Sequence, residues 1–328
     1  MFGPSPADTP AMRGNRRWGL LATACLLAAT VLPARAADVP TTTCRVFPTD
    51  NVWNMDVSNL HVHPKSNTWK ATMHSRTTNL HPDFGPPSYG IPFDVVGDAH
   101  ATTHVRFGYA SESDPGPYPF GSDTHVEGGS DRHALMINRD TCTLYELYGA
   151  EWNGGDPTAG SGAVFDLGSN TLRQATWTSA DAAGLPIFPG LVRWDEVQAG
   201  SIDHAIRITS DCTSRHYLWP ARHEAGVANA HCPPMGARFR LRMSFDLSGF
   251  GPGARTILTA MQRYGVIVAD NGSNWYFQGE VNGNWTNGLL DQLKSVPAGQ
   301  FIAVDENPCR VGPNTGAFAY GPNCPAPN

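Results

Sequence analysis

The sequence contains few charged residues, and basic residues are the scarcer kind. Only 16% of the 328 residues are charged, and 29 acidic residues outnumber 23 basic ones, which gives a formal net charge of −6 at pH 7. A protein that binds a phosphate backbone needs a basic surface. We therefore expect no nucleic-acid partner.

Several motifs of common catalytic sites are absent. The chain has no G-x-S-x-G sequence, and no G-K-[ST] follows the glycine-rich segment at residues 153–162. No two cysteines have C-x-x-C spacing, and the pair His100 and His104 lacks the glutamate of an H-E-x-x-H motif. These absences argue against a serine-nucleophile elbow, a phosphate-binding loop and a cysteine-based zinc site.

Long apolar runs are also missing, apart from one near the N-terminus. Residues 18–32 are apolar, and this run is shorter than the roughly 20 residues that span a bilayer. Three arginines precede it, and Ala34-Arg35-Ala36 follows it as a small-x-small cleavage site. We predict a signal peptide over residues 1–36, and therefore a secreted or extracellular protein with no membrane anchor after cleavage.

Cysteine usage agrees with export. Cys25 lies in the predicted signal peptide, and the remaining six cysteines form an even set that suggests three disulfides in an oxidising compartment. Six cysteines allow 15 pairings. We favour the pairs that close short loops, Cys212–Cys232 and Cys309–Cys324, which leaves Cys44–Cys142.

The residues that are plentiful predict a β-rich fold. Glycine (34), proline (27) and tryptophan (9) are frequent, as in secreted loop-rich proteins. Ten or more short segments, such as 134–137 and 266–270, are apolar or alternating and end at turn residues, which is typical of strands. We expect a single-domain, mainly-β protein, a β-sandwich or distorted barrel with a few short helices.

Helical spacing of apolar residues is clearest over residues 252–264. Shorter helices are expected at 192–197 and 287–293, and one helical turn at 179–184 with Ser179 as its N-cap. The predicted organisation is a signal peptide at 1–36, a linker at 37–43, one mainly-β domain at 44–305 and a Pro/Gly-rich, disulfide-stapled tail at 306–328. We expect a monomer.

Ionisable residues concentrate at residues 122–148, beside clear strand signals. Asp131 lies two residues before His133, and such residues share one face of a strand. The carboxylate can then hydrogen-bond to the imidazole and orient it for acid–base work, with Glu127 as a second carboxylate. The alternative is a structural Asp131–Arg132 pair beside a histidine with a purely structural hydrogen bond.

Three other segments add candidates. His204 begins a second His-Ala strand pattern, so we expect two neighbouring strands and His204 as another acid–base group in the cleft. Residues 219–223 combine a flat ring with a guanidinium and an imidazole, and residues 270–276 follow a strand end. A disulfide-loop brace and a simple hairpin are the respective alternatives. The predicted substrate-binding residues are Arg132, Trp219, Arg222, His223, Asp270 and Tyr276.

Metal binding is the second chemistry that these residues permit. We predict no cofactor, but His125, Glu127 and His133 can supply three ligands, with His204 or His223 as a fourth.

Several sequence blocks together resemble those of a family of secreted bacterial proteins. The resemblance covers about residues 44–305. It implies export and a single folded unit, and no particular activity. The blocks are F-P-x-D-N-x-W-N (47–54), D-R-H-A-L (131–135), W-T-S-A-D-A-A-G-L-P-I (177–187), I-D-H-A-I (202–206), W-P-A-R-H (219–223), P-P-M-G (233–236) and V-A-D-N-G-S-N-W-Y (268–276).

Three functions fit these observations. The first is a secreted carbohydrate-active enzyme, a glycoside hydrolase or polysaccharide lyase, that uses histidine and carboxylate groups on an extracellular glycan. The second is a non-catalytic glycan-binding or envelope protein with the same aromatic surface. The third is a metal-dependent hydrolase.

Overall fold

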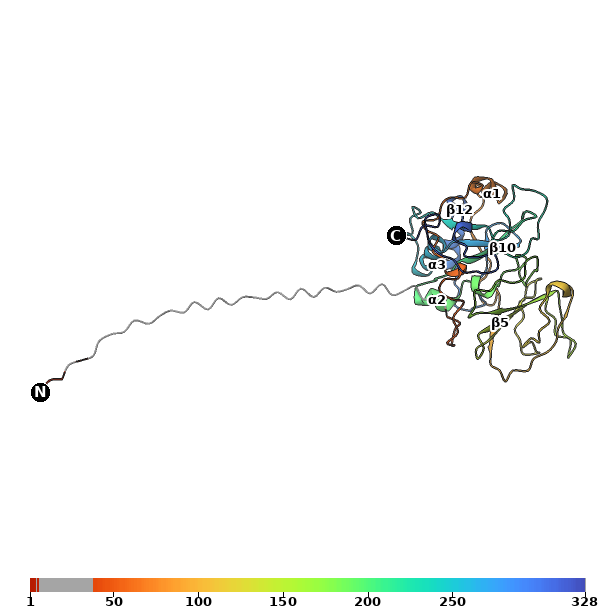
Figure 1. The fold of residues 1–328 in the computed structure, drawn as a ribbon, viewed down its shortest axis with the longest axis horizontal. Helices are drawn as coiled ribbons and strands as arrows, with labels where there is room; N and C mark the ends of the chain where they lie inside the picture. Colours follow the sequence, from red (N-terminus) through yellow and green to blue (C-terminus); the bar gives the residue numbers. More distant parts are fainter. Residues whose placement is uncertain (4, 6–37, 328) are drawn as a thin grey trace. The chain divides into compact units, whose positions relative to one another are not determined.

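Short apolar segments that end at turn residues form the strands of the protein. The computed structural model describes residues 1–3, 5 and 38–327. The predicted signal peptide lies outside the described residues except for 1–3 and 5. From Asp38 onward the described chain packs into one compact unit (Figure 1). Its fold is mainly β, with three sheets, including a curled half-barrel, and four short α-helices among the described residues, which confirms the predicted class.

The largest described sheet has six strands in the order β1-β11-β8-β10-β9-β12. Its central strands β8 and β10 are parallel, so their carboxyl ends meet at one edge of the sheet. Helix α1 packs against β12, and helix α3 packs against β9 (Figure 1). The strands are β1 (His81–Pro82), β8 (Ile206–Ser210), β9 (Arg238–Leu241), β10 (Val266–Asn271), β11 (Tyr276–Phe277) and β12 (Phe301–Val304).

A second sheet contains the predicted hairpin of residues 134–148. Its order is β2-β4-β5-β7, and β4 and β5 are antiparallel with a turn at residues 139–142. Beside it, β3 and β6 form a two-stranded sheet. These strands are β2 (Phe93–Val96), β3 (Arg106–Phe107), β4 (Ala134–Asn138), β5 (Thr143–Tyr148), β6 (Thr158–Ala159) and β7 (Ser161–Asp166).

Three of the four α-helices agree with the predicted segments. In α3 the buried residues Ala254, Ile257, Leu258 and Met261 recur at helical spacing. Helix α1 falls in a segment predicted as loop, and residues 179–184 form a turn instead of a helix, because the Ser179 hydroxyl accepts from the Asp181 N–H within that turn. The α-helices are α1 (Ser66–Thr72), α2 (Trp194–Ala199), α3 (Pro252–Arg263) and α4 (Asn287–Lys294), and the 3-10 helices are η1 (Val52–Asn54), η2 (Ala110–Glu112), η3 (Phe188–Gly190), η4 (Ala298–Gln300) and η5 (Asn307–Cys309).

Three disulfides link the predicted cysteine pairs. Cys44 is bonded to Cys142, Cys212 to Cys232, and Cys309 to Cys324. The first bond joins the start of the fold to the β4–β5 turn, and the other two close shorter loops. The pairing predicted from loop length is therefore confirmed.

Both ends of the described chain take part in packing. Val39, in the segment predicted as a linker, is 1% exposed, and its N–H donates to the Cys44 carbonyl. In the tail, buried Glu306 pairs with Arg238 of β9, and Ala317 forms a β-bridge with Asn51. No helix in the described part of the chain has the length and apolarity to span a bilayer.

Candidate functional site

Two adjoining hollows, of about 470 and 260 Å³, open at the carboxyl ends of β8 and β10. We call them the large lobe and the small lobe of one cleft, because Asp131, Asp270 and Asn271 line both. Ligands commonly bind at the carboxyl ends of strands in sheets with parallel strands. The large lobe is lined by residues that include Tyr109, Glu112, Tyr148, Asp181 and His223, and the small lobe by residues that include Glu127, His133, Arg207, Tyr276 and Gln278.

His133 and Glu127 form a hydrogen-bonded pair in the small lobe. The Glu127 Oε2 atom lies 2.6 Å from Nδ1 of His133 and also accepts from the His133 backbone N–H. Burial alone would raise the pKa of the Glu127 carboxyl, but the hydrogen bond and charge of His133 hold it below its usual value. A carboxylate can only accept, so Nδ1 of His133 carries a proton and donates it to Glu127.

The other ring nitrogen of His133, a residue that lines the small lobe, has no partner. The side chain is 4% exposed, and Nε2 is buried with no hydrogen-bond partner in the protein. Buried polar atoms nearly always have a partner, so an orphan atom at a cleft indicates a place for a ligand or water. With the proton on Nδ1, the Nε2 lone pair is free to accept a proton.

The sequence predicted Asp131 as the partner of His133, and the structure places Glu127 there instead. Arg132, between them, has a left-handed backbone (φ 48°), and β4 begins only at Ala134. Alternation along a strand therefore does not extend to Asp131. Asp131 is exposed on the border of the two lobes, whereas Arg132 turns away and donates from Nε to the Ala150 carbonyl.

Asp270, whose side chain is partly exposed to the cleft, belongs to a cluster with the buried residues Asp181 and Arg207. Arg207 of β8 donates to both Asp181 oxygens, at 3.0 and 2.7 Å, and lies 3.6 Å from Asp270. Burial, together with the neighbouring Asp181 charge, raises the pKa of Asp270 to about 8, and burial also raises the pKa of Asp181. Asp270 is therefore a carboxylic acid at neutral pH.

Tyrosines border both lobes. In the small lobe, Tyr276 stacks on His81 with ring centroids 3.9 Å apart, which fixes the plane of its ring. In the large lobe, Tyr109 is 58% exposed and Tyr148 is 37% exposed. The Tyr148 ring centroid lies 5.9 Å from that of His133. Flat, partly exposed rings suit the apolar faces of a ligand.

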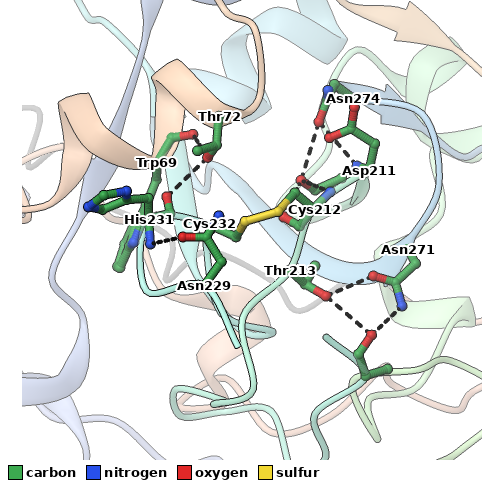
Figure 2. The surroundings of a disulfide bond; sticks show 12 residues. Trp69, Thr72, Asp211, Cys212, Thr213, Asn229, His231, Cys232, Asn271 and Asn274 are labelled. Atoms are coloured by element: carbon green, nitrogen blue, oxygen red, sulfur yellow. Dashed lines mark hydrogen bonds between the residues drawn. A yellow bond between two sulfur atoms is a disulfide. The ribbon is translucent and has the colours of Figure 1, made fainter. Parts of the chain in front are cut away.

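The Cys212–Cys232 loop supports one wall of the cleft. Figure 2 shows Thr213, next to Cys212, hydrogen-bonded to Asn271, and the Thr213 hydroxyl lies 2.7 Å from the Asn271 amide oxygen. The Asn271 amide nitrogen donates to the Ala225 carbonyl in the same loop. His223, in the same loop, lines the large lobe. Its Nδ1 atom lies 2.8 Å from the Ala182 carbonyl, and its Nε2 atom lies 3.7 Å from Glu112.

His204 does not reach the cleft. It lies before β8 and is buried against Glu196 and the Ala205 carbonyl. The residue of β8 that pairs with Asp270 is Thr209, five positions later, or roughly 16 Å along a strand. The expected neighbouring strands are also wrong, because β4 and β8 belong to different sheets. It is the far end of β8, with Arg207, that meets the cleft.

Trp219 and Arg222 form a brace. The Trp219 indole donates to the Thr315 carbonyl at 2.8 Å, and the ring is buried. The Arg222 guanidinium donates to the carbonyls of Arg173 and Pro313 and to Asn314, so its donors are occupied. Neither residue lines the described lobes, and their contacts match the alternative of a structural brace.

The residues proposed as metal ligands do not converge. His125 is largely exposed and pairs with Asp94 at 2.6 Å, whereas Glu127 and His133 bond to each other. Within residues 1–3, 5 and 38–327, no three His, Cys, Asp or Glu side chains are grouped as a metal site.

Sequence reasoning did not select several residues that the structure brings to the cleft, among them Asp181, Arg207, Tyr148 and Gln278. The sequence did contain a signal for Arg207. An arginine inside the apolar strand segment 205–208 is expected to be buried, and a buried charge needs a charged or hydrogen-bonding partner. Asp181 lies within the block at 177–187 but was assigned to a helical turn.

Comparison of the chain with family models, with curated proteins and with solved structures found no match. The resemblance described from the sequence blocks therefore stays a prediction.

Proposed function

We propose that this protein is a secreted glycoside hydrolase that cuts an uncharged glycan. The predicted signal peptide and the three disulfides support export. The tyrosines and the many hydrogen-bonding groups of the cleft support a carbohydrate ligand. The observation that carries the proposal is the buried, unpartnered Nε2 of His133 in the same lobe as Asp270, a carboxyl whose pKa burial raises to about 8.

The two groups divide the proton transfers of hydrolysis. Asp270 donates its proton to the glycosidic oxygen as the bond from that oxygen to the anomeric carbon breaks. His133 accepts a proton at Nε2 from a water molecule whose oxygen bonds to the anomeric carbon. Glu127 positions the imidazole and balances its positive charge, and Arg207 stabilises the carboxylate that Asp270 becomes. Asp131 stabilises the cationic sugar in the transition state.

The charges of the cleft favour a hydrolase over a lyase. A lyase that acts on uronic acids must neutralise a substrate carboxylate. The cationic groups of the described cleft are already committed, since Arg207 bonds to Asp181 and His223 lies beside Glu112. Asp83, Glu127 and Asp131 add negative charge to the lining. A neutral chain therefore fits better than a polyanion.

The test is a panel of neutral and uronic-acid polysaccharides, assayed for new reducing ends and for unsaturated products. We expect reducing ends from at least one neutral glycan and no unsaturated products. Asp270→Asn and His133→Gln should each lower kcat/KM about 100-fold or more, because each removes a proton-transfer group.

Matched controls are Asp246→Asn and His216→Gln, which change exposed residues outside the cleft. They should retain wild-type rates. Unsaturated products from uronic acids would indicate a lyase. Binding without turnover, unaffected by Asp270→Asn, would indicate the non-catalytic glycan-binding protein, and loss of activity in chelator the metal-dependent hydrolase.

A further inference from the structure

The cleft extends to both sides of the proposed proton donor. Asp131 and Asp270 line the large and the small lobe alike, so they stand at the junction of the two hollows. A bond positioned at Asp270 would therefore have space for a ligand group in each direction.

The small lobe offers a complete subsite for one sugar ring. Tyr276 presents a flat face that is held by His81. Gln278 adds a polar group to the same lobe. Its side chain is 6% exposed, and its amide nitrogen lies 3.4 Å from Asp83. Its Oε1 atom is buried and has no partner in the protein. An unpartnered amide oxygen is an acceptor that a sugar hydroxyl can satisfy.

The large lobe offers a second platform of the same kind. Tyr109 exposes more than half of its surface there, and Tyr148 exposes about a third of its own. Its polar lining comes from Ser161, Thr178 and Asn271. Because Tyr148 also lies close to His133, its ring continues the cleft from the small lobe into the large one.

From these two platforms we infer that the cleft binds an oligosaccharide across Asp270, with at least one sugar in each lobe, and that the enzyme cuts internal bonds of a chain. The endo specificity depends on the proposed hydrolase function, whereas the two-lobe binding does not. Tyr148 and Tyr276 are the binding residues on the two sides.

Binding is measured by titration calorimetry with the full-length mature Asp270→Asn variant, which separates affinity from turnover. The probes are linear α-glucan, β-glucan and β-mannan oligosaccharides of one to six units. In one series the affinity should rise about tenfold or more between one and three units and then level off. Tyr148→Ala and Tyr276→Ala, each added to this variant, should lower the affinity for the longer oligosaccharides about tenfold. Tyr320→Ala, a similarly exposed tyrosine on the tail, should leave it unchanged.

Equal affinity for one and six units, dependence on only one of the two tyrosines, or no binding in any series would overturn the inference. If the predicted length dependence is found but the wild-type enzyme cleaves nothing, the two-lobe binding stands and the hydrolase proposal fails. If wild-type enzyme releases only terminal units from long chains, hydrolysis stands and the endo specificity fails.

Discussion

Burial and a few contacts set the protonation pattern of the cleft. Glu127 fixes the Nδ1 proton of His133, and burial together with the neighbouring Asp181 charge raises the pKa of Asp270. One group is thereby prepared to accept a proton and the other to donate one, as separate acid and base roles require. The assignment of Asp270 as proton donor depends on its contact with residues distant in the chain. The assignment of His133 as proton acceptor depends on the backbone turn at Arg132, which the sequence did not predict.

The pH–rate profile should report the Asp270 proton. A general acid works only while protonated, so kcat/KM should fall as the pH rises through about 8, to which burial and Asp181 raise its pKa. Asp181→Asn removes that neighbouring charge and frees Arg207 to stabilise the Asp270 carboxylate, so the alkaline limb should move to lower pH. Asp246→Asn should not move it. An alkaline limb that is identical in Asp181→Asn and wild type would contradict the assignment.

Residue types and local spacing predicted part of the site. Asp270, Tyr276 and His223 were identifiable because polar or aromatic residues follow strand or loop boundaries, and all three line the cleft. Trp219 and Arg222 have the same chemistry but face the tail. Nothing local distinguishes the two outcomes, because the tail that uses these donors lies about 90 residues later in the chain.

At the scale of secondary-structure elements, an irregularity in β10 determines where the Asp270 side chain lies. The register between β10 and β8 shifts between Val268 and Asp270, so Asp270 pairs with Thr209. Such a bulge redirects the side chain that follows it. Strand existence was predictable from apolar runs, but pairing was not. The similar His-Ala patterns of β4 and β8 predicted neighbouring strands, but the two strands lie in different sheets. A pattern this short indicates which face of a strand is buried and does not identify the strand that pairs with it.

Removing the Cys212–Cys232 disulfide should loosen the cleft wall. The double variant Cys212→Ser/Cys232→Ser frees a loop whose Thr213 and Ala225 hold Asn271. We expect a loss of about 2–4 kcal/mol in the free energy of unfolding and an increased KM, with a smaller change in kcat. Urea unfolding and steady-state kinetics measure the two effects.

The matched control is Cys44→Ser/Cys142→Ser, which removes the bond at the β4–β5 turn. It should lower stability without a comparable rise in KM. An unchanged KM in the Cys212 and Cys232 variant would show that the wall is held without the disulfide.

For the whole molecule, buried carboxyl groups couple the fold to pH. Burial raises the pKa of Glu146 to about 7, against the opposing hydrogen bonds from Phe188 and Ile187. Burial likewise raises the pKa of Glu306 to about 7, against the opposing charge and hydrogen bond of Arg238. A carboxyl whose pKa is higher in the folded than in the unfolded chain binds more protons when folded. Its contribution to stability is complete below the unfolded value and is lost as the pH rises through the folded value.

The free energy of unfolding should therefore decrease between about pH 4.5 and 7. Glu146→Gln keeps an acceptor for the two N–H groups and removes the titration, so it should flatten this slope, by up to about 3 kcal/mol across the window. Denaturant unfolding at several pH values measures it. Exposed Glu224→Gln should keep the wild-type slope, and a Glu146→Gln slope equal to wild type would disprove the assignment.

The brace between residues 219–223 and the tail has a consequence for biosynthesis. The carbonyls of Pro313 and Thr315 hold Arg222 and Trp219, and His223 enters the large lobe directly after them. A ribosome makes Pro313 and Thr315 about 90 residues after Trp219 and Arg222, at about 5–20 residues per second. A nascent chain that has not yet reached residues 313–315 thus lacks these contacts, so the wall that carries His223 is finished only after those residues have been made.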